Sequence, residues 1–439
     1  MFPDTSAVRE HTAPIDTDWG ATTGINDPGP KGVSVPSEAV SGILGGGSGP
    51  HVVGLGEVTH GTRECFLLKT NLVRELVEHH GFRTLAMEAD VAETRALDAF
   101  VRRGVGDPAT ALRGLHRWMW QVESVRDLLG WLRSFNRNRP ADDRVRVRGL
   151  DLSHPAAPAA PLRSYLETVD PDYAEQSDAL ARLDTLAEET VPDDTGPREQ
   201  TLGRVERAVA TVAERLDDER ARYVAATGDR WEAARHLCRV VRQTCDWHRV
   251  RHEQPGPHAA GMQQRDRAMA ENAAWCARQD PGTGVAVWAH NVHVERGTFD
   301  SYGPWADATG MGEFLAREFG ARYTPVGFDT ARGRFRAVRS GGGDTGPEQF
   351  VFDSPPDGSA TAEFDRVGES PWLFDIASAA TDPRLRDWVT QQQQVRCVGT
   401  VYDPDTPARH HLRTPLTSFD GLLFLDRSTP SRPVADPEG

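Results

Sequence analysis

The stretch that decides the fold is residues 51–90, "HVVGLGEVTHGTRECFLLKTNLVRELVEHHGFRTLAMEAD". Residues 51–57 form an apolar run typical of a buried strand. Residues 62–81 have the apolar spacing of a helix that ends at Gly81, and residues 82–90 predict a second strand. A strand, a helix and a strand in this order form a right-handed crossover, which makes the two strands parallel.

The same alternation continues along the rest of the chain. Three more candidate strands, each preceded by a helical pattern, lie at residues 144–152, 284–294 and 322–330. The sequence therefore predicts an α/β fold, with an open, mostly parallel sheet and helices on both faces. Two later pieces, at residues 332–338 and 419–427, look like parts of hairpins.

The composition changes twice along the chain. Residues 1–50 are rich in Gly, Pro, Ser and Asp, which predicts a partly irregular N-terminal arm. Residues 51–439 read as one α/β domain. Within it, residues of about 155–263 show helical periodicity without a strand signal, so we expect a helical insertion that packs over an edge of the sheet.

The net charge indicates which kinds of partner the protein can bind, and the cysteine pattern indicates its cellular compartment. The formal net charge of -15 argues against nucleic acid and anionic membranes, whose phosphates would be repelled. We see no long apolar run and no secretory signal, and the five cysteines form no CxxC pair. We expect a cytoplasmic protein that is a monomer or a small homo-oligomer.

The acidic surface leads to a prediction about salt. Lysine occurs only at Lys31 and Lys69, while aspartate is abundant. High-GC coding bias would also replace lysine by arginine, but the acidity favours a halophile, of haloarchaeal type. We therefore expect the melting temperature to rise from low salt to molar KCl, because salt screens self-repulsion. A melting temperature that stays flat or falls would contradict the halophile assignment.

Ionisable residues follow four of the predicted strands where each strand ends. Ligands of open parallel sheets bind beyond the carboxyl ends of the strands, so these residues should converge in one site. Each of them alone is more often structural, and their joint placement is what indicates a site. The residues are Glu57, His60, Glu88, Asp151, His290 and His293.

The chemistry that this set permits is hydrolysis. A histidine beside a carboxylate can take a proton from water, and Glu57 precedes His60 by three residues. Arg63 and Glu64 follow closely and are candidate supporting residues. No G-x-S-x-G sequence is present, which argues against a nucleophile-elbow serine hydrolase. Cys65 lies among apolar neighbours and reads as an inert thiol.

Two further segments allow more than one interpretation. Trp118 and Trp120 precede a predicted helix, and they are either core residues or the lining of an apolar cleft for a bulky ligand, with Glu123 at its mouth. Arg265 and Asp266 open another predicted helix. We interpret Asp266 as a residue of that helix N-terminus rather than a catalyst.

These residues resemble a known family. The segment 54–90 closely resembles the first motif of the erythromycin esterase family. The resemblance continues, in the order expected for the family, over most of the chain beyond residue 50. It is carried by residues 146–153, 265–279, 285–294, 311–320, 322–337, 370–376 and 419–426.

The resemblance implies a metal-independent esterase without a cofactor, which opens a macrolide lactone or another small-molecule ester with activated water. His60 takes the place of the family's general base, and Glu57 and Glu88 take the places of its essential carboxylates. His290 corresponds to the second functional histidine, with His293 as its companion. Lys69 falls where members of the family often have arginine, which keeps the charge and loses the bidentate fork.

Two other functions stay open at this point. The same carboxylates and imidazoles are acceptable ligands for zinc or manganese, so a metal-dependent hydrolase on this fold is one alternative. A non-catalytic homologue that binds a hydrophobic small molecule is the other. Metal analysis of the purified protein, together with activity with and without a chelator, separates the first alternative from the esterase.

Overall fold

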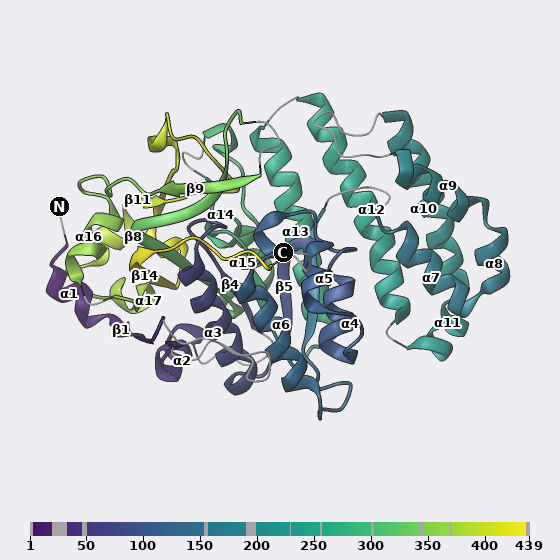
Figure 1. Cartoon of the computed structure of the whole chain (residues 1–439), viewed down its shortest axis with the longest axis horizontal. Helices are drawn as coiled ribbons and strands as arrows, with labels where there is room; N and C mark the ends of the chain where they lie inside the picture. Colours follow the sequence, from purple (N-terminus) through teal and green to yellow (C-terminus); the bar gives the residue numbers. More distant parts are fainter. Residues whose placement is uncertain are drawn as a thin grey trace.

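The chain (Figure 1) is described from a computed structural model, which covers residues 3–19, 33–45, 51–152, 157–189, 199–228, 230–254, 257–299, 303–342, 346–368 and 370–435. Parts of the predicted N-terminal arm, and residues 190–198 of the predicted helical insertion, lie outside these residues.

One large sheet organises the described residues. Its central strands run parallel in the order β14-β8-β4-β7-β5-β6, and β10 and β1 extend it with antiparallel pairings beyond β14. β9 pairs antiparallel and β12 pairs parallel with the far part of β8. The strands are β1 (Thr12–Pro14), β4 (Val52–Leu55), β5 (Phe82–Asp90), β6 (Arg146–Asp151), β7 (Gly284–Trp288), β8 (Tyr323–Arg339), β9 (Pro347–Val351), β10 (Trp372–Asp375), β12 (Val401–Tyr402) and β14 (Gly421–Ser428).

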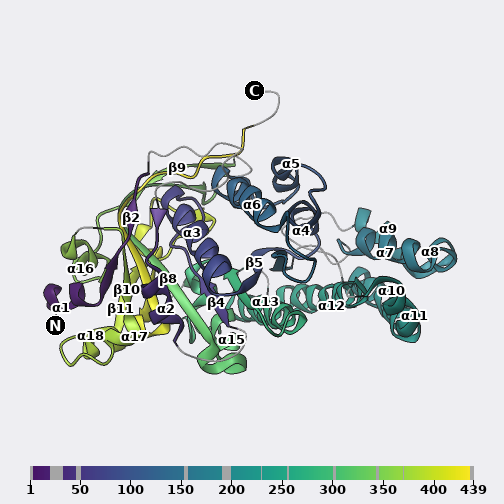
Figure 2. The same cartoon turned by 90° about the horizontal axis from the view of Figure 1, so that it is seen from below.

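Helices cover both faces of this sheet, as predicted. Successive residues of a strand point to opposite faces, and β4 shows this directly: Val53 and Leu55 join one hydrophobic core while Val52 joins the other. Figure 2 shows α3 and α6 on one side of the strands and α13 and α15 on the other. The first face carries α2 (Ser37–Leu44), α3 (Arg63–His79), α4 (Arg95–Arg103), α5 (Pro108–Arg113) and α6 (Glu123–Asn136), and the second carries α13 (Ala259–Gln279), α15 (Met311–Phe319), α16 (Ala360–Val367) and α18 (Arg386–Thr390).

Two predicted elements differ from the structure. The strand expected at 284–294 ends at Trp288, and Asn291–Val294 forms the short helix α14, whose N-cap residue is His290. The piece at 419–427 is part of the central sheet, because β14 pairs parallel with β8 and not as a simple hairpin. Residues 332–338 continue β8 and do form an antiparallel pair with β9.

The N-terminal segment contributes regular structure. α1 (Thr5–Glu10) packs near α16, and β1 pairs with β10 at one end of the main sheet. β2 (Asp16–Thr17) and β3 (Val33–Ser34) form a separate pair. Within the described residues, this segment is therefore less irregular than its composition predicts.

The helical middle of the chain forms a group with its own core. It projects from the end of the molecule beyond α4 and α13 (Figures 1 and 2), and α12 packs against α13 beside the β6 edge. Its helices are α7 (Ala159–Val169), α8 (Pro171–Gln176), α9 (Asp178–Glu189), α10 (Glu199–Asp218), α11 (Arg220–Thr227) and α12 (Arg230–Glu253). Among the helices described, none is both long and apolar enough to cross a membrane.

Candidate active site

A pocket of about 490 Å³ lies where the parallel strands end. His60, Glu88, His290 and His293 line it. His60 follows β4, Glu88 lies among the last residues of β5, and His290 and His293 follow β7. The C-terminal part of the chain supplies the opposite side. Its lining residues there are Ser340, Gly399, Thr400, Val401, Asp403, Thr406, Arg409 and His410.

The loop that carries His60 is held by close backbone contacts. The Gly61 carbonyl oxygen accepts hydrogen bonds from the backbone N–H groups of Arg336 and Ser431, at 3.1 Å and 2.8 Å. A Cβ atom at Gly61 would lie 1.9 Å from the Arg336 carbonyl oxygen, so glycine is required by this close approach. The chain of β8 thereby fixes the position of His60 relative to the sheet.

A buried network of hydrogen bonds, centred on Glu57, lies behind His60. Its Nδ1 lies 2.5 Å from Glu57 Oε1, and Lys69 Nζ donates to Glu57 Oε2 at 2.6 Å. The Trp288 indole N–H also donates to Glu57 Oε2, at 3.0 Å. Burial alone would raise the pKa of Glu57, but Lys69 and His60 together lower it, so the carboxylate is ionised. Glu57 therefore holds His60 in the tautomer that carries its proton on Nδ1. This tautomer leaves Nε2 available as a proton acceptor.

A second network of charges centres on Arg265. Its Nε and Nη2 bind the two oxygens of Asp151 at 2.8 Å and 2.7 Å, and Nη2 also donates to Glu88 Oε1 at 2.9 Å. Arg117 reaches Asp151 at 3.2 Å. Although burial acts to raise the pKa of Glu88, His293 and then His60 and Arg265 hold it well below its usual range. The network thus keeps two carboxylates charged at the pocket floor.

His293 belongs to this network as a cation. Its Nδ1 lies 2.7 Å from Asp266 Oδ1, and its Nε2 lies 3.2 Å from Glu88 Oε1. Burial acts to lower the pKa of His293, but Asp266 and Glu88 outweigh it and raise the pKa to about 9. In this protonated form Nε2 is a donor, so the 3.1 Å approach of Arg265 Nη1 is a contact between two donors. Arg265, which lines the pocket, therefore has no acceptor for Nη1 among these contacts.

The raised pKa of His293 predicts a specific pH dependence. A group whose pKa is higher in the folded state contributes stability that is complete below its unfolded pKa of about 6.5 and is lost as pH rises through about 9. The stability difference between the wild type and His293→Asn should therefore shrink by on the order of 3 kcal/mol between those pH values. Urea unfolding of both proteins over this range measures it. A difference that does not change with pH would contradict the protonated state.

His290 has a different environment and stays neutral. Burial, and then the neighbouring His60, lowers the pKa of His290 to about 3. Its Nε2 lies 3.1 Å from the Val398 carbonyl oxygen, and its ring centroid lies 5.0 Å from that of His60. Its backbone N–H donates to Glu88 Oε2 at 3.0 Å. These contacts make His290 a positioning residue that joins the His60 loop to the 397–400 segment.

Three residues of the predicted set, Lys69, Glu64 and Arg63, do not line the pocket. Lys69 is fully buried behind Glu57 and does not line the pocket wall, because its amine is drawn to Glu57 and to the Ala289 carbonyl oxygen at 3.0 Å. Glu64 accepts hydrogen bonds from the Thr429 backbone N–H and hydroxyl, both at 2.6 Å. Arg63 donates to the Trp19 carbonyl oxygen at 3.2 Å. Arg63 and Glu64 thus anchor terminal segments of the chain.

The tryptophan pair and Glu123 also belong to the framework. Trp120 is fully buried beneath the site, donates to the Glu88 carbonyl oxygen at 3.2 Å and packs edge-on against Trp288. Trp118 packs against the same core, with the Arg336 guanidinium 5.4 Å from its ring centroid. Glu123 is the first residue of α6, where the helix dipole favours a carboxylate. None of the three lines this pocket among the described residues, and both tryptophans pack in or against the hydrophobic core.

Sequence reasoning missed the role of α13. This helix begins at Ala259, so Arg265 and Asp266 lie in its second turn and face the site. Asp266 is fully buried, and it accepts from the Met311 backbone N–H at 2.9 Å in addition to its contact with His293. A signal was available, because an adjacent Arg-Asp pair inside an otherwise Ala-rich helix face requires partners once it is buried.

The geometry of the site bears on the role of Cys65 and on metal binding. Burial raises the pKa of the Cys65 thiol to about 12, which fits the inert role expected for it. No group of three or more His, Cys, Asp or Glu side chains within the described residues has an arrangement that could hold a metal ion. The carboxylates of the site are already in ion pairs: Glu57 pairs with Lys69, and both Glu88 and Asp151 pair with Arg265.

Solved structures of similar shape support the fold. A protein from Bacillus cereus superposes with a TM-score of 0.77 at 23% identity, over 98% of both chains. A succinoglycan biosynthesis protein gives 0.76 at 19%, over 98% of this chain and 97% of that one. An erythromycin esterase mutant in its open conformation gives 0.64 at 17%, over 91% and 95%.

Comparisons of sequence identify the family. A putative hydrolase of Bacillus subtilis (strain 168) is 21% identical over 396 residues, which cover 87% of this chain and 85% of that protein. Erythromycin esterase type II of Escherichia coli is 24% identical over 313 residues, which cover 65% and 70%. The family model for erythromycin esterase matches residues 77–428, most of the chain. The chain therefore belongs to the erythromycin esterase family.

Proposed function

We propose that this protein is a hydrolase that cleaves a carboxylic ester or a macrolide-type lactone with water activated by His60. The observation that carries the proposal is the arrangement of His60, whose ring lines the pocket while its Nδ1 is held by the ionised Glu57. The family membership and the names of the two relatives, a putative hydrolase and an erythromycin esterase, support hydrolysis.

In the proposed reaction, His60 Nε2 accepts a proton from a water molecule as its oxygen attacks the substrate carbonyl carbon. The Glu57 carboxylate stabilises the imidazolium that forms, and Lys69 keeps Glu57 ionised in the buried site. The tetrahedral intermediate then collapses. His60 returns its proton to the departing alkoxide, which leaves as an alcohol together with a carboxylic acid.

The cations beside His60 suit the charge that develops on the carbonyl oxygen. Arg265 and Arg117 line the pocket, and Arg265 Nη1 has no carboxylate partner among its contacts in the described residues. Preorganised donors of this kind stabilise an oxyanion without reorganisation during the reaction. Asp151 and Glu88 fix the guanidinium in place, so they act as positioning residues.

The pocket also has an apolar part that suits an organic substrate. Met262, Val292, Pro304, Trp305 and Val401 line it beside the charged floor. Its size lies in the range of sites for small molecules. A small-molecule ester or lactone is therefore the partner that we propose, processed without a metal or cofactor in a cytoplasmic setting.

A panel of substrates tests the proposal. The purified protein is incubated with macrolides, smaller lactones and linear carboxylic esters. Mass spectrometry detects an opened lactone as a product heavier by one water, and a cleaved linear ester as its separate acid and alcohol. Hydrolysis of at least one class by the wild type, and of none by His60→Ala, is the expected result. Activity that disappears with a chelator and returns with a divalent metal would instead favour the metal-dependent alternative.

A further inference from the structure

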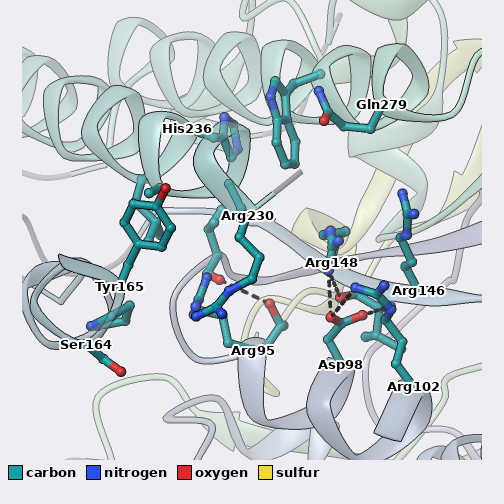
Figure 3. Close-up of a pocket in the computed structure, with 18 of the residues that line it drawn as sticks. Arg95, Asp98, Arg102, Arg146, Arg148, Ser164, Tyr165, Arg230, His236 and Gln279 are labelled. Carbon is teal, nitrogen blue, oxygen red and sulfur yellow. Dashed lines mark hydrogen bonds and ion pairs between the residues drawn. The ribbon is translucent and has the colours of Figure 1, made fainter. Parts of the chain in front are cut away.

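A second pocket, of about 460 Å³, lies between α4, β6 and the helices α7, α12 and α13, away from the site that holds His60. Figure 3 shows its arginines reaching in from α4, β6 and α12. We call it the arginine pocket and define it by its charged lining among the described residues, which is Arg95, Asp98, Arg102, Arg103, Arg146, Arg148 and Arg230.

Six arginines thus face a single carboxylate in this lining, in a chain whose formal net charge is -15. Asp98 is already occupied. Its Oδ1 accepts from the Val147 backbone N–H at 3.0 Å, and its Oδ2 lies 3.0 Å from Arg148 and 3.8 Å from Arg102. Arg146 is paired with Asp280.

Three of the arginines have no ion-pair partner in the part of the chain that the structure describes: Arg95, Arg103 and Arg230. All three side chains are exposed at the rim of the pocket. The protein groups near Arg95, and then the charge of Arg148, lower the pKa of its guanidinium. Crowding of like charges is unfavourable, and a bound anion relieves it. Arginine is also the side chain best suited to phosphate, because its planar fork donates two parallel hydrogen bonds.

A buried histidine also contributes to the lining of the arginine pocket. His236 is 5% exposed, stacks on Trp275 with ring centroids 3.9 Å apart, and lines the arginine pocket. Within the described residues its Nδ1 has no hydrogen-bond partner. Burial, and then the charge of Arg239, lowers the pKa of His236 to about 3, so the ring stays neutral beside the arginines.

We propose that the arginine pocket binds a small organic molecule that carries two or more phosphate groups. The volume exceeds what a single phosphate needs, and the wall formed by Tyr165, His236 and Trp275 supplies ring surfaces beside the guanidinium groups. A bound ligand would bridge α4 and β6 of the sheet domain to α7 and α12 of the helical group.

Isothermal titration calorimetry at fixed ionic strength tests this proposal with pyrophosphate, ADP and sulfate as probes. We expect saturable binding of pyrophosphate or ADP and none of sulfate over the same range. Tighter binding of ADP than of pyrophosphate would support an organic phosphate ester. Equal binding of the two would contradict the organic part of the proposal. No saturable binding of either probe, or binding only of a long RNA oligonucleotide, would overturn the proposal.

Matched variants separate a loss of probe binding from a loss of folding. Arg95→Gln and Arg230→Gln each remove a guanidinium that has no ion-pair partner among the described residues, so the melting temperature without ligand should be unchanged or higher. Each should weaken probe binding by about tenfold or more, which is the loss of a charge-assisted contact. Arg137→Gln, at an exposed position at the end of α6, is the control and should bind normally. Equal affinities of Arg95→Gln, Arg230→Gln and the control would overturn the assignment.

Discussion

Replacing His60 with alanine is expected to reduce ester hydrolysis by about 10²–10⁴-fold, the usual contribution of a general base. The loss should appear in kcat and not only in KM, because the histidine acts on water as the carbonyl is attacked. Steady-state kinetics on the best substrate of the panel measure it.

The fold should survive this substitution, since His60 sits at the pocket surface of the loop that Gly61 anchors. A melting temperature close to that of the wild type establishes this. His79→Ala is the matched control, because His79 lies at the exposed end of α3. A His60→Ala protein that folds normally and keeps near-normal turnover would contradict the proposed mechanism.

Replacing Lys69 with methionine is expected to destabilise the protein by about 3–5 kcal/mol, because it leaves the charge of Glu57 buried without its cation. Methionine keeps the length and apolar character of the stem, so the effect isolates the ammonium group. Urea unfolding at neutral pH measures the change in the free energy of unfolding. Activity should fall as well, since an uncompensated Glu57 is driven toward its protonated form.

Lys69→Arg is the informative control for this prediction. It keeps the positive charge and can place two donors on Glu57, so most of the lost stability should return. The larger guanidinium must also fit against Trp288, whose ring centroid lies 4.6 Å from the Lys69 amine. A methionine variant as stable as the wild type would show that the pair contributes nothing to the fold.

The sheet and the convergence of the strand ends could be predicted from the sequence. Apolar runs followed by Glu57, Glu88 and His290 gave the strand ends, and parallel geometry brings such ends to one edge. β14 was harder to place, because a strand of this kind finds its partners through contacts distant in sequence. Its continuous apolar run, "GLLFL" at 421–425, is nevertheless typical of a strand buried on both faces.

The residues that hold the side chains of the site in place could not be predicted from the spacing of residues in the sequence. Proximity in sequence brought Arg63 and Glu64 into the predicted set, but both lie at the start of α3 and turn to the terminal segments. Arg265 is distant in sequence from Glu88 and Asp151, and only the packing of α13 against β5 and β6 brings them together. The lining from residues 399–410 depends on the two-residue strand β12 and on the loops around it, which are too short to carry a periodic signal.

The central claim is that water activated by His60 attacks the substrate directly, without a covalent intermediate on the protein. Single-turnover hydrolysis in H₂¹⁸O, with enzyme in excess over substrate, tests this most directly. The mechanism predicts that the acid product of the first turnover carries one ¹⁸O atom and that the protein gains no label. An unlabelled acid product, together with ¹⁸O in the carboxylate of Glu57 or Glu88, would show that a protein carboxylate attacked first and would contradict the mechanism.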